Sequence, residues 1–231
     1  MKKIILGLWL VVSGLSADGI YATFTVQAKQ SANLAFSSSG IVKKVLVEVT
    51  NEVKKGDTIA VLNNDDLKAM LEVSKTAVKY AKLDYDRQLK VKHMIDKSKF
   101  DKYAFKYENT KAQLAYQQSL LNKTILKAPF DGVIYDKLIE VGDVVSGQMI
   151  KTVFKIQSQT KQKLVLEFDQ KYWQSVKVGQ TFKYGVDGDS KIYEGKISKI
   201  YPFASSGNRK IKAEVEVDGF IVGLFGEGNI Q

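Results

Sequence analysis

The chain has 231 residues, of which 45% are hydrophobic and 26% are charged, a balance typical of a folded protein that excludes global disorder. It contains no cysteine, which excludes disulfides and a lipid-modified N-terminal cysteine. The formal net charge of +10 suits anionic lipid or an acidic protein. We expect no nucleic-acid partner, because the lysines are interspersed with Asp and Glu.

The N-terminus has the order of a secretory signal. Two lysines precede an apolar run over residues 4–12, and small residues follow as far as Ala17. We predict a signal peptide over residues 1–17, cleaved near Ala17, and a periplasmic location. The apolar run is shorter than the roughly 20 residues of a membrane-spanning helix. A retained N-terminal anchor is the alternative.

Apolar and polar residues largely alternate over residues 39–62, which predicts a strand, a turn and a second strand. The turn centres on Gly56, because glycine adopts a positive φ that residues with a Cβ resist. Residues 21–35 precede this unit and are predicted to form a strand. We assign that strand to a separate β-barrel, and the alternative is that it joins the same sheet sandwich.

The stretch from Asp65 to Lys123 contains no Pro or Gly, and its seam residues recur at alternating steps of four and three. Two helices of about 30 and 25 residues, roughly 45 and 38 Å long, should reverse near residues 95–98. We predict an antiparallel coiled-coil hairpin over residues 63–123. Its seam comprises Leu67, Leu71, Ser74, Val78, Ala81, Tyr85 and Gln88, then Phe100, Tyr103, Tyr107, Thr110, Leu114, Gln117 and Leu121.

After the hairpin the chain repeats its earlier strand, Gly-Asp turn and strand. Such self-similarity indicates two halves of one small β-sandwich, residues 36–62 and 124–157. The corresponding positions are Gly132 with Gly40, and Gly142-Asp143 with Gly56-Asp57.

Short strands separated by glycine turns fill the rest of the chain. Residues 163–168 and 193–202 are strand-like, and a turn is predicted at Gly179. We predict a small β-barrel made from residues 21–35 and 158–231. One predicted inward face consists of Ile211, Ala213, Val215 and Val217.

Several short motifs combine with this arrangement to identify a family. They are Gly40-Ile41-Val42, Val53-Lys54-Lys55-Gly56-Asp57, Ala128-Pro129-Phe130-Asp131-Gly132 and Val141-Gly142-Asp143. Between Leu34 and Gly228 the chain resembles the periplasmic adaptor (membrane fusion protein) family of the HlyD and AcrA type. One motif matches in part, because the family's Leu-x-Pro-Gly corresponds to Leu224-Phe225-Gly226-Glu227-Gly228, without the Pro.

The resemblance implies a mixed β plus α-hairpin fold. The elongated chain would comprise a lipoyl-like β-sandwich, an antiparallel coiled-coil α-hairpin and a small β-barrel. Many family members have a further membrane-proximal domain built from both chain ends. We expect that domain to be absent or vestigial, because little sequence precedes Leu34 or follows the barrel.

The hairpin tip of the family often carries Arg, then Leu four residues later, then Ser seven residues after that. This chain has Arg87, Val91 and Ser98 at the same spacing, and the resemblance implies that they dock with a TolC-like outer-membrane channel. The residues themselves place Arg87 and Val91 one helical turn apart, with Ser98 suited to cap the second helix. The plainer interpretation is a solvated charge, a seam residue and an N-cap.

No catalytic, cofactor-binding or metal site is predicted. The only histidine is His93, near the hairpin tip, and no acid pair clusters elsewhere. A lipoyl or biotin carrier presents a lysine between its two halves, whereas residues 62–67 contain none. Met70, Met94 and Met149 are widely separated, so we expect packing roles rather than binding of a soft metal ion.

These features predict a non-enzymatic periplasmic adaptor that links an inner-membrane efflux transporter, of the RND type in preference to the ABC type, to a TolC-like channel for drug export. The adaptor would associate with the inner membrane through the transporter. It should form a homo-oligomer, because one hairpin cannot seal a conduit. A metal-ion efflux or ABC-type export system is the alternative, and a lipoyl or biotin carrier is a distant one.

Overall fold

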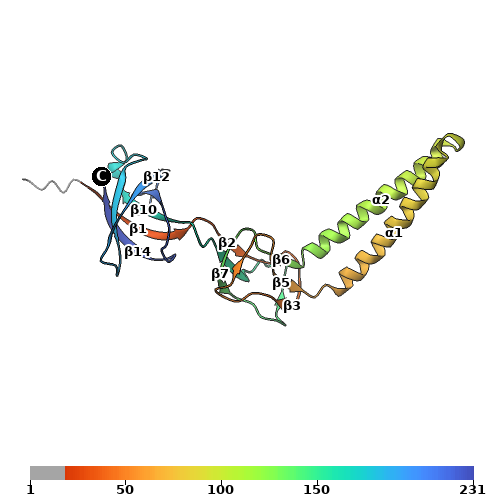
Figure 1. Ribbon diagram of the computed structural model, residues 1–231, viewed down its shortest axis with the longest axis horizontal. Coiled ribbons are helices and arrows are strands. Elements are labelled where there is room, and N and C mark those ends of the chain that lie inside the picture. Colours follow the sequence, from red (N-terminus) through yellow and green to blue (C-terminus); the bar gives the residue numbers. More distant parts are fainter. Residues whose placement is uncertain (1–18) are drawn as a thin grey trace, which may run out of the picture. The chain divides into compact units, whose positions relative to one another are not determined.

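The computed structural model describes residues 19–231, so the predicted signal peptide lies outside the described residues. Two compact units divide the chain (Figure 1). One unit combines the segment that ends at Ala28 with Thr160–Gln231, and the other comprises Lys29–Gln159.

Six antiparallel strands close into a barrel in the first unit (Figure 1). In the order in which they neighbour one another, these are β1 (Ile20–Ala28), β10 (Gln162–Asp169), β13 (Lys210–Val217), β12 (Ile192–Ala204), β11 (Thr181–Val186) and β14 (Phe225–Ile230). The short 3₁₀ helix η2 (Gln170–Tyr172) follows β10.

The barrel core follows from the alternation of its strands. Ile211, Ala213 and Val215 of β13 are buried on one face, as the sequence predicts, because successive residues of a strand point to opposite faces. The ring of Phe24 packs edge-on against Tyr184, with their centroids 5.2 Å apart. The strands therefore surround a packed interior.

Gly226 allows β14 to complete the barrel. A Cβ at this position would lie 2.2 Å from the carbonyl oxygen of Gly185 and 2.5 Å from the ring of Phe24. No side chain fits there, so glycine is required for the close approach of β14 to its neighbours.

Two four-stranded sheets form the sandwich of the second unit. One sheet has the order β2 (Ser31–Leu34), β9 (Phe154–Gln157), β7 (Gly132–Lys137) and β4 (Glu52–Val53); the other has β6 (Ile125–Lys127), β5 (Thr58–Leu62), β3 (Gly40–Val45) and β8 (Val144–Val145). Each sheet takes two strands from the segment before the helices and two from the segment after them. The two halves therefore interlock and share one core.

The segment over residues 21–35 divides between the units. β1 pairs with β10 in the barrel as far as Ala28, whereas Leu34 of β2 pairs with Phe154 in the sandwich. Our assignment of residues 31–34 to the barrel is therefore wrong. The reason is that the side chain of Leu34 is buried in the sandwich core.

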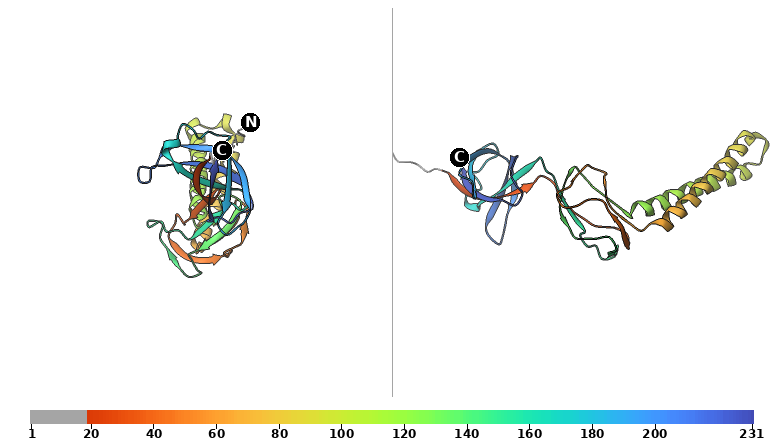
Figure 2. Two further views of the ribbon diagram at one scale, coloured as in Figure 1. Left: turned by 90° about the vertical axis from the view of Figure 1, so that its left-hand side faces the viewer. Right: turned by 60° about the horizontal axis from the view of Figure 1, so that its bottom comes forward.

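Two helices of 26 residues each, α1 (Asp65–Lys90) and α2 (Lys97–Asn122), run side by side in opposite directions (Figures 1 and 2). Every predicted seam residue is buried or half-buried. The ring of Tyr85 lies 5.6 Å from that of Phe100 and 5.5 Å from that of Tyr107, centroid to centroid. No helix within residues 19–231 is both long enough and apolar enough to cross a bilayer.

The chain reverses between the helices earlier than predicted. α1 ends at Lys90, and a 3₁₀ helix, η1 (Lys92–Met94), precedes α2. The first helix is thus shorter than the expected length of about 30 residues. The reversal occupies residues 91–96 rather than 95–98.

Candidate docking site

Arg87 lies in the last turn of α1, and its side chain is 68% exposed. Its Nη1 atom lies 3.2 Å from Oδ1 of Asp84, and Oδ2 of Asp84 lies 3.6 Å from Nζ of Lys106 on α2. Asp84 therefore orients the guanidinium and connects it to the second helix. The exposed part of the planar guanidinium is able to bind carbonyl oxygens of another protein.

Val91 is the C-cap residue of α1, where its N–H donates a hydrogen bond to the carbonyl oxygen of Gln88. The side chain is 38% exposed, so it is not one of the buried seam residues. Met94 on η1 is 87% exposed. The tip thus presents exposed apolar side chains within seven residues of Arg87 along the chain.

Ser98 lies in the first turn of α2 and is exposed. The N-cap is Asp96, whose Oδ1 accepts hydrogen bonds from the N–H groups of Ser98 and Lys99 at 2.7 and 3.3 Å. The prediction that Ser98 caps this helix is wrong, because the Asp96 carboxylate already accepts the first backbone N–H groups. Arg87, Val91 and Ser98 all lie at the hairpin end remote from the sandwich (Figure 1).

Acidic side chains are interspersed among the basic ones at the tip. Oδ2 of Asp86 lies 2.6 Å from Nζ of Lys82, and Asp96 is engaged as a cap. Nζ of Lys92 lies over the ring of Phe100, 5.0 Å from its centroid. His93 is exposed on η1. The tip is therefore a mixed polar surface rather than a uniformly basic one.

The base of the hairpin contains a buried polar contact that the sequence did not indicate. Nδ2 of Asn64 donates to Oγ1 of Thr124 at 2.9 Å, and that hydroxyl donates to the carbonyl oxygen of Leu121 at 2.6 Å. Beside it, a hydrogen bond from Lys43 lowers the pKa of Asp65. These contacts hold the two helices where they leave the sandwich.

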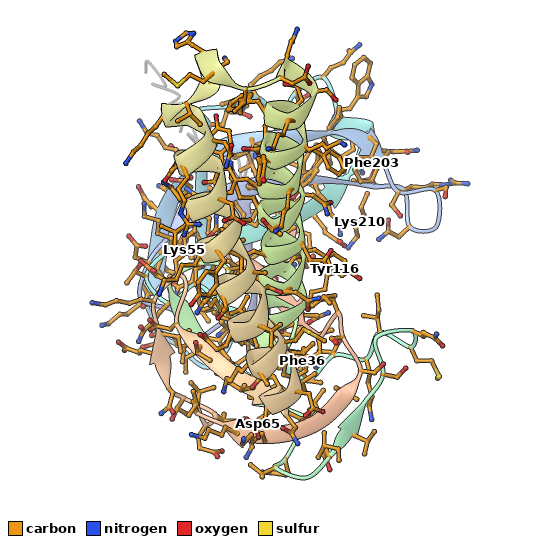
Figure 3. The ribbon with its side chains drawn as sticks, turned by 90° about the vertical axis from the view of Figure 1, so that its right-hand side faces the viewer. Phe36, Lys55, Asp65, Tyr116, Phe203 and Lys210 are labelled. Atoms are coloured by element: carbon orange, nitrogen blue, oxygen red, sulfur yellow. The ribbon has the colours of Figure 1, made fainter. Side chains whose placement is uncertain are left out.

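The outer faces of the helices carry large apolar side chains that no other part of residues 19–231 covers. We call them the outer stripe: Met70, Val73 and Tyr80 on α1, and Phe105 and Tyr116 on α2. Successive members within each helix are three, seven or eleven residues apart, spacings that occur in a heptad seam. Figure 3 shows Tyr116 on the side of α2 that faces away from α1.

The methionines do not pack in the core as expected. Met70, Met94 and Met149 are 51%, 87% and 79% exposed. They lie on α1, on η1 and in the loop before β9, so they do not form one ligand set. Among residues 19–231 no three His, Asp or Glu side chains gather as metal ligands.

The barrel wall contains a buried acid that the sequence analysis did not single out. Glu214 forms an ion pair with Lys163, and its Oε1 accepts a hydrogen bond from the hydroxyl of Tyr201 at 2.7 Å. Burial raises the pKa of Glu214, but the hydrogen bonds from Lys163 and Tyr201 outweigh that effect and the net shift is downward. The cluster joins β10, β12 and β13.

A closed barrel, an interlocked sandwich and a helical pair inserted between the halves of that sandwich define the membrane fusion, or periplasmic adaptor, class of proteins. The family model for the CzcB-like, barrel-sandwich hybrid domain matches residues 30–157, more than half of the chain. The chain therefore belongs to this family.

Individual relatives are more distant. The cobalt-zinc-cadmium resistance protein CzcB of Cupriavidus metallidurans is 22% identical over 203 residues, which cover 80% of this chain and 39% of CzcB. Two curated relatives are matched over only 52% and 39% of their own lengths. The chain thus spans about half of one of these relatives and about two fifths of the other.

Solved structures support the same fold. A MacA–MexA chimera containing the α-hairpin domain of Pseudomonas aeruginosa MexA is similar with a TM-score of 0.85 and 21% identity, covering 92% of this chain and 81% of the chimera. The membrane fusion protein Spr0693 of Streptococcus pneumoniae is similar with a TM-score of 0.74 and 17% identity, covering 92% and 98%.

Proposed function

We propose that this protein is a non-enzymatic periplasmic adaptor that links an inner-membrane efflux transporter to a TolC-like outer-membrane channel. The main structural support for this proposal is the insertion of the helical hairpin between two interlocked sandwich halves. This arrangement fixes the base of the hairpin through Asn64 and Thr124 and leaves its tip available to another protein.

Arg87, Val91 and Ser98 are the proposed contacts with the channel. An exposed guanidinium beside an exposed aliphatic side chain combines hydrogen-bond donors with apolar area, as interface contacts often do. The ion pair between Arg87 and Asp84 is solvent-exposed and contributes only about 0.5 kcal/mol to stability. Because the pair adds little to stability, we propose that this arginine serves binding.

The adaptor is further proposed to act as a homo-oligomer in which hairpins lie side by side. The outer stripe supports this proposal, because its heptad spacing suits contact with another helix. Burial of such aromatic side chains on association is favourable at about 25 cal/mol per Å² of apolar area. Several hairpins together would enclose a conduit that one hairpin cannot form.

Drug export through an RND-type transporter is the proposed activity, with an ABC exporter as the other possible partner. Efflux of metal ions is the second candidate, favoured by the similarity to CzcB, which is named for cobalt, zinc and cadmium resistance. A strain that lacks the gene separates the two. Increased sensitivity to drugs but not to these metals supports drug export, and the reverse result supports metal efflux.

The docking proposal is tested by charge reversal. Arg87→Asp should abolish drug export by the pump without lowering the amount of the adaptor protein. Lys111→Asp is the matched control, because Lys111 forms a helical ion pair with Glu108 at the same spacing and the same 3.2 Å distance, in the middle of α2. Unchanged resistance in the Arg87→Asp strain would contradict the proposal.

A further inference from the structure

One end of the barrel presents exposed aromatic side chains. Trp173, which follows η2, is 64% exposed, and Phe203 near the end of β12 is 58% exposed. Both line an open groove of about 760 Å³, together with Ile200 and Pro202. We call this surface the aromatic–basic end; Figure 3 labels Phe203 of β12 and Lys210 at the start of β13, which pairs with β12.

The aromatic–basic end is held as one surface by backbone hydrogen bonds. The N–H of Gln170 in η2 donates to the carbonyl oxygen of Arg209 in the turn between β12 and β13, at 3.0 Å. Oδ1 of Asp169 accepts a hydrogen bond from the N–H of Lys171 at 2.9 Å and so caps η2. The groove is therefore preformed.

Basic residues outnumber acids in the two segments that form this end of the barrel. The sequence has no Asp or Glu over residues 170–186 or 195–213. The nearest acids are already engaged: Asp169 caps η2, Glu167 forms ion pairs with Lys210 and Lys212, and Glu214 forms ion pairs with Lys163 and Lys199. The two segments carry Lys171, Lys177, Lys183, Lys196, Lys199, Arg209, Lys210 and Lys212.

The N-terminal sequence leads to the same end of the barrel. β1 starts there, since Ile20 pairs with Ile230 and Ala22 pairs with Phe168, whereas Ala28 at the opposite end pairs with Gln162. Seven residues, 13–19, separate β1 from the apolar run over residues 4–12. Fully extended, such a stretch spans about 25 Å at most. Where the apolar run is retained as an anchor rather than cleaved near Ala17, a bilayer that holds it lies within about 25 Å of the start of β1 and is therefore close to the aromatic–basic end.

We propose that the aromatic–basic end docks on the surface of an anionic phospholipid bilayer. Trp173 and Phe203 insert at the level of the headgroups, where aromatic rings are favoured, and Lys171 and Arg209 lie against the lipid phosphates. An acidic protein would satisfy the same charges. The bilayer is favoured because a retained N-terminal run would be joined to this end of the barrel by only seven residues, 13–19. The inference does not rest on the proposed efflux function.

The test uses the full chain with Trp9→Phe, so that Trp173 is the only tryptophan. Vesicles of equal parts phosphatidylcholine and phosphatidylglycerol, with brominated acyl chains, should quench its fluorescence. Vesicles of phosphatidylcholine alone should quench it much less. Quenching should decline near an ionic strength of about 1 M, where the Debye length falls to about 3 Å. Readout at Trp173 separates docking of the barrel from capture of the chain by its N-terminal run.

Matched variants sharpen the result. Lys171→Gln with Arg209→Gln should weaken the vesicle affinity detected at Trp173 on the order of thirtyfold, because each cation near an anionic surface contributes about fivefold. Lys54→Gln with Lys55→Gln removes the same amount of charge from the sandwich and should leave the vesicle affinity unchanged. Phe203→Ala should weaken docking, whereas Phe225→Ala, equally exposed at the other end of the barrel, should not.

The proposal is overturned if the chain sediments with anionic vesicles while Trp173 remains unquenched. It is also overturned if the sandwich variants weaken docking as much as the barrel variants. Binding of polyglutamate at the groove without any response to vesicles would assign this end to an acidic protein instead.

Discussion

Asp57 and Asp143 close two turns of the same geometry, one in each half of the sandwich. Oδ2 of Asp57 accepts a hydrogen bond from the N–H of Lys54 at 2.8 Å, and Oδ2 of Asp143 accepts one from the N–H of Glu140 at 2.9 Å. The repeated Gly-Asp motif of the sequence thus corresponds to a repeated structure.

The glycine before each aspartate makes a reciprocal contact with the other half. The N–H of Gly56 donates to the carbonyl oxygen of Ala128 at 2.8 Å, and the N–H of Gly142 donates to that of Val42 at 2.9 Å. The glycines have φ values of 92° and 99°. Each half therefore holds the turn of the other, which explains how the sandwich tolerates the inserted hairpin.

Gly56→Ala and Gly142→Ala should each destabilise the sandwich by about 1–2 kcal/mol, because a residue with a Cβ is strained at positive φ. Open space surrounds both positions, so no steric clash adds to the strain. Urea unfolding measures the change. Gly207→Ala is the control, since its φ is not positive and its site is equally open. Equal loss in all three variants would contradict the strain explanation.

Asp96→Ala should reduce stability by about 1 kcal/mol and expose the first turn of α2, because the carboxylate caps it. Ser98→Ala should change stability by less than about 0.5 kcal/mol. Hydrogen exchange of the Ser98 and Lys99 amides reports the fraying directly. If Ser98→Ala frayed the helix as much, Ser98 would have a capping role that the geometry does not assign to it.

Glu214→Gln should destabilise the barrel by about 2 kcal/mol at neutral pH, because it leaves Lys163 half-buried without its anion. The pKa of Glu214 is lowered by folding, so its contribution is complete above the unfolded value of about 4.3 and disappears as the pH falls through the folded value. At neutral pH the melting temperature of Glu214→Gln should be lower than that of the wild type. At strongly acidic pH the two melting temperatures should be the same.

Glu194→Gln is the control for this experiment. Glu194 forms an exposed ion pair with Lys183, with Oε1 and Nζ 3.3 Å apart, and its loss should cost less than about 1 kcal/mol. A difference between wild type and Glu214→Gln that persists undiminished in acid would show that packing, not charge, accounts for the effect.

Phe105→Ser combined with Tyr116→Ser should weaken self-association by about tenfold or more, because both exposed rings belong to the outer stripe. Sedimentation velocity over a range of concentrations detects the change, and circular dichroism should show unchanged helix content. Phe225→Ser, a similarly exposed ring on the barrel, serves for comparison. Association that survives the double change would rule out side-by-side packing through this stripe.

The sequence predicted the elements whose pattern is local. The heptad spacing identified every buried seam residue from Leu67 to Leu121, because helix packing repeats along the chain. The Gly-Asp repeat identified the two halves of the sandwich for a similar reason. The sheet to which a strand belongs depends instead on its tertiary partners. Ser31–Leu34 pairs with a strand more than a hundred residues away, and no local sequence pattern indicates that pairing.

The same limit applies at the candidate site. Asp96 and Ser98 are both good N-cap residues, and only the course of the preceding turn selects Asp96. Glu214 occupies a polar position on an alternating strand, and its burial depends on Lys163 and Tyr201 from two other strands. Arg87, Val91 and Ser98 were selected by family resemblance, and their docking role stays a prediction.

Photocross-linking in living cells tests the central claim most directly. A photoreactive amino acid placed at residue 87 or 98 should capture an outer-membrane channel protein, whereas the same probe at residue 111, about 20 Å further along α2 from its start, should not. Failure to capture any channel from residues 87 and 98, with folding and export of the protein intact, would contradict the account of this chain as a connector to the outer membrane.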